Sequence, residues 1–341
     1  MKKKVCRVIA FLCILSLIFL KLNSILSFKY TDGILQMERF YELEEGTVDV
    51  LVLGSSHAFV NVNPAVLYEE YGIASYNLCA SMQPTWNTYY YLKEALEYQT
   101  PELIVMDVYR LVEEFDYSKD SKIVKNTYGM RLGKNKYEAV KANVREGEAG
   151  LVWMHMLEFP VFHSRYAELT REDFCPEIIA SENYKGFHPL FETNKMKKPD
   201  IRFIGEKTEI SPKTLEYFEK ILELAEEKDI PLLLINAPYI MSADDKKIFN
   251  SLEEYLSLQT VNDDVRYLDL NVRYNKVGIK FKTDFADENH LNVKGVQKFN
   301  LYLGRYIKKH YEISDRRGDA AFASYEENVK EWKALLESKE E

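Results

Sequence analysis

The apolar positions of the chain form short continuous runs separated by longer segments with helical periodicity. Residues 48–53 (VDVLVL) are an almost unbroken aliphatic run that ends at Gly54, as expected for a strand buried on both faces of a sheet. Similar runs follow at 74–78, 103–108, 231–237 and 265–270. Between them, helices are predicted at 63–71, 85–98, 211–228, from 242 onward, and at 293–309. This alternation predicts an α/β domain with a parallel sheet and right-handed crossovers.

The alternation is interrupted between residues 111 and 205. This segment is rich in aromatic and charged residues and contains no clean strand run. We interpret it as a mostly helical insertion that covers part of the loop end of the sheet; a separate domain is the alternative. The sequence therefore predicts an α/β domain over 47–310 with insertion 111–205. An acidic C-terminal tail over 311–341, with one helix around 325–336, follows.

The N-terminus carries a long apolar segment. Three lysines and Arg7 precede an apolar run at 8–20, and the apolar character continues to Phe28, which makes the segment long enough to cross a bilayer. Lys21 would then reach the outer interface with its flexible stem. No A-x-A cleavage site follows, and the positive charges favour an inside N-terminus.

We therefore expect residues 1–29 to form an uncleaved signal anchor, a single-pass helix in the cell membrane. Residues 30–46 would be a connector, and the body would lie outside the cytoplasm. A cleaved signal peptide is the alternative.

Charge and cysteine content narrow the function classes. The net charge is −9 and no long basic run follows the first few residues, which argues against a nucleic-acid partner. The four cysteines show no metal-ligand spacing, and a single bridge between Cys79 and Cys175 is left open. No metal or organic cofactor is implied.

Two polar motifs lie where chemistry is expected in a parallel sheet, at the carboxyl ends of the strands. Gly54-Ser55-Ser56-His57 follows the first strand directly, and Asp287-Glu288-Asn289-His290 directly precedes the last helix. A serine on a tight turn needs a general base, and an imidazole held by a carboxylate provides one. We predict a catalytic triad of Ser56, His290 and Asp287. A Ser-Ser pair after a strand is also a common helix cap, and this reading is the alternative.

Together, G-S-S-H after the first strand and D-x-x-H-L-N-x-x-G more than 200 residues later resemble the SGNH (GDSL-type) hydrolases. The resemblance covers about 48–108 and 231–309, but not the insertion. It implies a flavodoxin-like three-layer sandwich with Ser56 as nucleophile, His290 as general base and Asp287 as its orienting partner. The chain is most similar to the membrane-anchored, envelope-modifying branch. That branch includes the D-alanyl transfer protein of teichoic-acid alanylation and the alginate acetylation proteins, which work beside membrane-bound O-acyltransferases.

The chain departs from the family pattern around the oxyanion hole. Ser55 replaces the usual Asp before the nucleophile, as it does in the teichoic-acid branch. The oxyanion glycine of the second block is matched only loosely, by Ser81 or the neighbouring Ala80. The Asn of the third block has no match after residues 103–108, so one oxyanion donor is missing or replaced.

Other polar residues have a structural and a functional interpretation. His57 adjoins the nucleophile, but neighbouring side chains on a tight turn point apart, which favours His290 as the base. Arg110, at a strand's carboxyl end, could bind an anionic polymer or form a structural salt bridge. Packing or surface roles are favoured for the histidines of the insertion, His155, His163 and His188. Core packing is also favoured for its aromatic residues, with a glycan or acyl groove as the alternative: Trp153, Phe159, Phe162, Tyr166 and Phe187.

These observations predict a serine esterase or O-acyltransferase that acts on an acylated glycan or teichoic polymer. A membrane-bound O-acyltransferase is the expected protein partner. A secreted esterase for small substrates is one alternative. The other is a catalytically silent SGNH-like subunit that binds polymer or docks an acyltransferase. The sequence leaves open the acyl group, the acceptor, and whether the acyl group is hydrolysed or transferred.

Overall fold

The structure is a computed structural model that describes residues 2–112, 117–118, 120–175, 184–201, 203–258 and 264–340. Within these ranges it contains a five-stranded parallel sheet in the order β2-β1-β3-β4-β5. The strands are β1 (Val50–Gly54), β2 (Ser75–Cys79), β3 (Leu103–Asp107), β4 (Leu232–Asn236) and β5 (Val265–Asp269). The predicted α/β class with a parallel sheet is confirmed. β1 to β4 are buried along their whole length, which explains their continuous apolar sequences.

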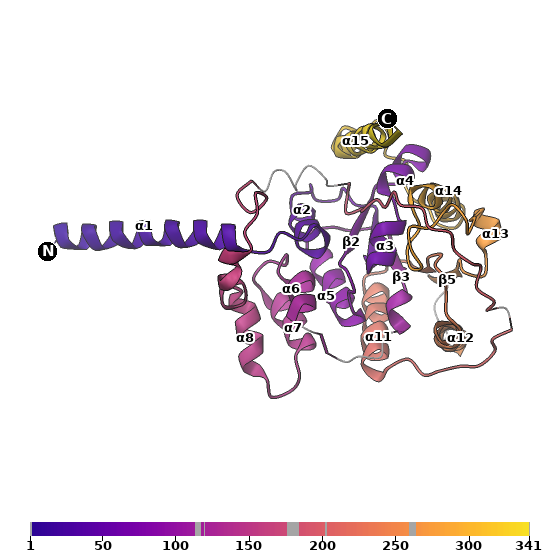
Figure 1. Ribbon diagram of the computed structural model, residues 1–341, viewed down its shortest axis with the longest axis horizontal. Helices are drawn as coiled ribbons and strands as arrows, with labels where there is room; N and C mark the ends of the chain where they lie inside the picture. Colours follow the sequence, from indigo (N-terminus) through magenta and orange to yellow (C-terminus); the bar gives the residue numbers. More distant parts are fainter. Residues whose placement is uncertain are drawn as a thin grey trace.

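Helices cover both faces of the sheet (Figure 1). Because strand side chains alternate between the faces, Leu51 and Leu53 join one apolar cluster and Val50 and Val52 join the other. The first cluster includes side chains of α2 (Gln36–Phe40), α5 (Thr85–Ala95), α11 (Pro212–Glu227) and α12 (Ala243–Leu258). The second includes side chains of α3 (Ser56–Asn61), α4 (Pro64–Tyr71), α13 (Tyr274–Val277) and α14 (Val293–His310).

Among its described residues, the insertion is helical only in its first part. The helices described there are η2 (Tyr109–Val112), α6 (Asp120–Thr127), α7 (Lys134–Asn143), α8 (Ala149–Leu157), α9 (Phe159–Phe162) and η3 (His163–Ala167). Residues 184–201 run as an extended strap with no helix, which corrects the expectation of a mostly helical segment there. The strap is held by backbone bonds to distant elements, including Asn77 N–H to Lys185 O at 3.0 Å and His188 N–H to Phe59 O at 2.9 Å.

The N-terminal helix α1 (Lys2–Leu26) projects away from the α/β domain (Figure 1). An 18-residue window within Lys3–Leu26 has a mean hydropathy of 2.5 and no buried residue, so the helix is long and apolar enough to span a membrane.

The predicted connector folds into η1 (Thr31–Leu35) and α2 rather than an irregular link. Gly33 in η1 has a φ of +74°, and a Cβ there would lie 2.1 Å from Lys125 O, so only glycine fits.

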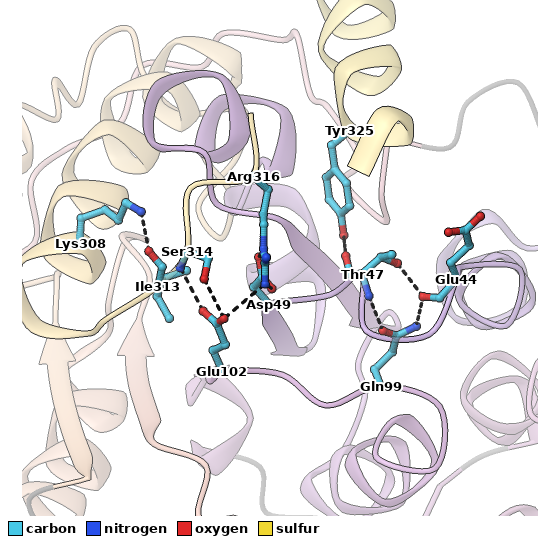
Figure 2. A network of polar contacts seen from close by, with 10 residues as sticks. All are labelled: Glu44, Thr47, Asp49, Gln99, Glu102, Lys308, Ile313, Ser314, Arg316 and Tyr325. Carbon is cyan, nitrogen blue, oxygen red and sulfur yellow. Dashed lines mark hydrogen bonds and ion pairs between the residues drawn. The ribbon is translucent and has the colours of Figure 1, made fainter. Parts of the chain in front are cut away.

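The C-terminal tail is part of the fold and lies across the amino ends of β1 and β3 (Figure 2). Arg316 donates two hydrogen bonds of 2.8 Å to Asp49, the residue before β1. Ser314 donates to Glu102, the residue before β3, from both its N–H and its hydroxyl. Beyond them, Tyr325 of α15 (Ala323–Glu340) donates to Thr47 O at 2.9 Å. The tail therefore covers the amino ends of these strands, whereas the turn that carries Ser56 lies at the opposite, carboxyl end of β1.

Candidate active site

The turn from β1 into α3 places Ser56 at the start of a helix. Gly54 has a φ of +141°, and a Cβ there would lie 3.0 Å from the Ala58 Cβ and 3.1 Å from the Asp107 Cβ, so the turn is closely packed. Ser55 occupies the N-cap position, but its side chain makes no capping hydrogen bond. Ser56 is half-buried, and as the first helical residue it has an N–H that no preceding turn accepts. Ser55 therefore takes the N-cap position that the alternative interpretation expects, but without the hydrogen bond of a side-chain cap.

The loop before α14 holds Asp287 behind the His290 ring. Both carboxylate oxygens lie 3.0 Å from His290 Nδ1. One of them also accepts the backbone N–H of Asn289 at 2.7 Å and of His290 at 2.9 Å. Ile240, which follows β4, donates its N–H to Glu288 O at 2.7 Å and fixes the loop from the side. The imidazole is thus oriented by a local carboxylate on a braced loop.

Buried asparagines join the two motifs across 230 positions of sequence. Asn61, the last residue of α3, accepts the Leu291 N–H on its side-chain oxygen at 3.1 Å. Asn300 of α14 donates to Asn61 O at 2.7 Å and accepts the Asn63 N–H at 2.9 Å. The helix that begins at Ser56 and the loop that carries His290 are therefore hydrogen-bonded to each other.

Sequence reasoning did not single out Asn61 or Asn300. The signal that could have found them is an asparagine inside an otherwise apolar helix face, which requires a buried partner.

The second imidazole nitrogen of His290, Nε2, is not the one that Asp287 contacts. Nε2 is buried and has no hydrogen-bond partner among the described residues, so Ser56 Oγ does not contact it in this conformation. With the Nδ1 proton directed at Asp287, Nε2 carries the lone pair, as a general base requires. Catalytic hydrogen bonds are often long in unliganded enzymes and shorten when substrate binds. The arrangement is competent to accept a proton from a hydroxyl brought to Nε2.

His57 lies beside His290, although the sequence argument set it aside. The two ring centroids are 5.4 Å apart. His57 stacks on Tyr109 with centroids 3.5 Å apart, and Tyr239 packs edge-on at 5.1 Å. The ring is buried, and neither of its nitrogens has a hydrogen-bond partner among the described residues. Burial, and then the nearby His290 and Arg110, hold the pKa of His57 well below its ordinary value, so it is neutral in the folded protein.

The neutral His57 predicts a loss of stability in acid. The unfolded chain takes up a proton on this histidine below about pH 6.5, whereas the folded protein does not, so the free energy of unfolding falls as the pH drops below that value. The slope due to one histidine reaches about 1.4 kcal/mol per pH unit. His57→Phe keeps a ring on Tyr109 and removes the titration. Thermal unfolding midpoints between about pH 7.5 and pH 5 should therefore fall less steeply in the variant. Equal slopes for the two proteins would contradict the assignment.

After β3, where the resemblance to the SGNH hydrolases implies a donor Asn, the chain has a hydrogen-bond acceptor. Asp107, at the end of β3, accepts the N–H groups of Tyr109 at 3.0 Å and Ala237 at 3.1 Å. Burial raises the pKa of Asp107 to about 7, against the lowering effect of these two N–H donors. Arg110 is 5% exposed and lies close enough to His57 to lower the pKa of that histidine, so it borders the site from within the protein.

The other predicted residues are dispersed. The Ser81 N–H is donated to the Asp32 carboxylate at 2.8 Å, so oxyanion binding by Ser81 would require this bond to break. Cys79 and Cys175 are both free, and no bridge joins them. His155 is buried against Tyr128, whereas His163 and His188 are exposed.

The aromatic side chains of the insertion fall into two groups. Phe162 and Phe187 are buried in apolar clusters, as the packing interpretation expects. Trp153 and Tyr166 are exposed. Trp153 lines a cavity of about 730 Å³ with Tyr90, Tyr137 and Tyr217.

No protein-family model matches this chain, and no curated protein sequence matches it. The interpretation of the site therefore rests on its own residues and on the contacts that bring the two motifs together. Within the described ranges, no group of three or more His, Cys, Asp or Glu side chains could hold a metal ion.

The asparagine bridge predicts a stability effect. Asn61→Ala leaves the buried Leu291 N–H without an acceptor, which costs about 1–3 kcal/mol of unfolding free energy. It should also loosen the His290 loop. Asn289→Ala is the matched control, because its side chain is exposed and lies on the same loop. Chemical denaturation of the two variants measures the difference, and equal stability would show that the bridge is not formed.

Proposed function

We propose that this protein is a membrane-anchored serine acyl-hydrolase or acyltransferase of the SGNH type. Its substrates would be ester-linked acyl groups on a cell-envelope glycan or teichoic polymer. The proposal is supported above all by one observation. Asp287 lies 3.0 Å from Nδ1 of His290, and the His290 ring lies beside His57, the residue after Ser56, with ring centroids 5.4 Å apart.

The residues support a two-step reaction. Ser56 Oγ attacks the acyl carbonyl carbon while its proton passes to His290 Nε2, and the resulting imidazolium is stabilised by Asp287. The ester C–O bond then breaks, and the leaving alcohol takes the proton from Nε2. The acyl group remains on Ser56 until water, giving hydrolysis, or a sugar hydroxyl, giving transfer, attacks its carbonyl carbon and passes a proton to His290 Nε2. The bond between the acyl carbon and Ser56 Oγ then breaks, and Oγ takes the proton back from Nε2.

Oxyanion stabilisation is the weakest part of the site. The N–H of Ser56, at the start of α3, is the donor that the turn provides. Ser81 already donates to Asp32, and Asp107 presents acceptors to its neighbours. Loss of one oxyanion donor costs about 10²–10³ in kcat. The proposed enzyme is therefore slow, which suits transfer between neighbouring polymers better than bulk hydrolysis.

The substrate class follows from the proposed anchor. Helix α1 is long and apolar enough to cross a membrane, and its lysines and Arg7 favour a cytoplasmic N-terminus. A tethered domain on the outer side meets envelope polymers at high local concentration.

A catalytically silent binding subunit of a membrane O-acyltransferase system is the second candidate. It is favoured by the absence of a hydrogen bond between Ser56 Oγ and His290 Nε2.

Turnover separates the two candidates. Purified full-length protein in detergent would be given p-nitrophenyl acetate and an O-acetylated polysaccharide, with and without a sugar acceptor. The proposed enzyme releases p-nitrophenol in both cases, faster with acceptor if it is a transferase. A silent subunit gives the rate of buffer alone while still binding the polysaccharide.

A further inference from the structure

Helices α8 and α9 carry apolar side chains that the rest of the protein covers only in part: Trp153 lies beside Tyr137, with ring centroids 6.0 Å apart, and is otherwise exposed. The sequence of α8 (AGLVWMHML) contains no Asp, Glu, Lys or Arg. Val152 and His155 face the domain and are buried, whereas Trp153 is 59% exposed and Leu157, one turn further on, is 67% exposed. Two large apolar side chains, exposed one turn apart on a helix without charged residues, suit a partner that is itself apolar.

This surface is continuous with the side of α1. The ring of Phe159, the first residue of α9, lies 5.3 Å from the ring of Phe19 in α1. Phe19 precedes the end of α1 at Leu26 by seven residues, which is about 10 Å along a helix. Phe159 therefore lies about 10 Å short of the end of α1, beside the apolar part of that helix.

The contact is fixed by a clamp at the end of α1. Arg165 of η3 donates to Leu26 O at 2.7 Å and to Ser27 O at 2.6 Å, and its other nitrogen pairs with Asp173 at 2.9 Å. Lys29 donates to Ser24 O and Ser27 O, both at 2.7 Å. Cations at the carboxyl end of a helix bind its open carbonyls and complement its dipole. Helices α8 and α9 are thus held at a set position relative to α1.

The direction of α8 suits the same partner. Figure 1 shows α8 running across the direction of α1, on the side of the domain from which α1 leaves. If α1 crosses a bilayer, α8 lies along the plane of that bilayer. Helices that lie in the headgroup region present Trp and Leu to the acyl chains in this way.

We propose that α8 and α9 form a second membrane contact, with Trp153, Leu157 and Phe159 inserted into the outer surface of the bilayer that α1 crosses. This inference rests on the proposed role of α1 as an anchor.

The second membrane contact would also fix which side of the domain faces the membrane. The connector after α1 contacts the loop that follows β2, through Asp32 to Ser81 and Gly33 to Ala80, so the carboxyl edge of the sheet is tied to the membrane-proximal side.

The chain contains its own probe for this contact. Its three tryptophans are Trp86, Trp153 and Trp332, and the first and last are buried inside the domain. Full-length protein would be reconstituted into phosphatidylcholine vesicles with and without bromine on the upper acyl chain. Bromine quenches tryptophan that reaches the acyl region. The wild type should lose the Trp153 share of its emission in brominated vesicles, and Trp153→Phe should show equal emission in both.

Two controls complete the experiment. Trp153→Phe combined with Leu258→Trp places an exposed tryptophan at the end of α12, on the side of the domain away from α1, and should not be quenched (Figure 1). Retention of the protein on vesicles after an alkaline wash reports on α1 separately. Equal quenching of wild type and Trp153→Phe, with the protein retained, would overturn the α8 contact alone. Loss of the protein in the wash would overturn the anchor and this contact together.

Discussion

Ser56→Ala is expected to lower kcat for ester cleavage by at least about 10⁴, because it removes the proposed nucleophile and leaves His290 without a proton to accept. The matched control is Ser55→Ala on the same turn. The Ser55 hydroxyl is buried and has no hydrogen-bond partner among the described residues, so its loss should change kcat by less than about tenfold. Steady-state hydrolysis of p-nitrophenyl acetate measures both variants.

The other members of the triad should follow a graded pattern. Asp287→Asn preserves the loop but no longer fixes the Nδ1 proton, so it should cost about 10³–10⁴ in kcat. Combining it with Ser56→Ala should add little, since residues that act as one unit are not additive. A Ser56→Ala protein with activity close to wild type, or an additive double variant, would show that the reaction does not pass through this serine.

Arg316→Ala is expected to lower the free energy of unfolding by about 2–4 kcal/mol and the melting temperature by about 5–10 °C. Asp49 is 3% exposed, and both its carboxylate oxygens accept from Arg316 (Figure 2). Burial already raises the pKa of Asp49, and the arginine is the main influence that opposes this rise. Without Arg316, the carboxylate is left buried without its main cation. Differential scanning calorimetry of the full-length protein in detergent gives the shift.

The neighbouring arginine provides the control. Arg317 pairs with Asp315 on the surface, where both side chains are 47% exposed, so Arg317→Ala should cost less than about 1 kcal/mol. Asp49→Asn combined with Arg316→Ala should recover part of the loss, because no charge is then left buried. Equal melting temperatures for the two arginine variants would show that the tail does not brace the amino ends of β1 and β3.

The strands could be predicted from sequence because they are buried on both faces. Residues 48–53 and 103–108 read as aliphatic runs, and the structure places strands there within two residues at either end. The first residues of helices could also be predicted where the sequence contains a typical N-cap residue. Asn63 before Pro64 caps α4, and Asn292 caps α14.

Other features depend on contacts that no local pattern shows. Helix α3 begins at Ser56 itself, although the polar Ser55-Ser56-His57 reads as a turn. His57 lies next to His290 because Tyr109 and Tyr239, from loops after two other strands, form the pocket around its ring. The extended strap was missed because its long-range backbone hydrogen bonds run to residues at least 85 positions away, as between Met196 and Phe281.

If Ser56 is an activated nucleophile, a fluorophosphonate should modify it covalently. The full-length protein would be incubated with the reagent, digested, and its peptides sequenced by mass spectrometry. We expect one adduct, on Ser56, that is absent in Ser56→Ala and strongly reduced in His290→Ala. An unlabelled protein, under conditions that label a control esterase, or an adduct on a different residue would contradict it.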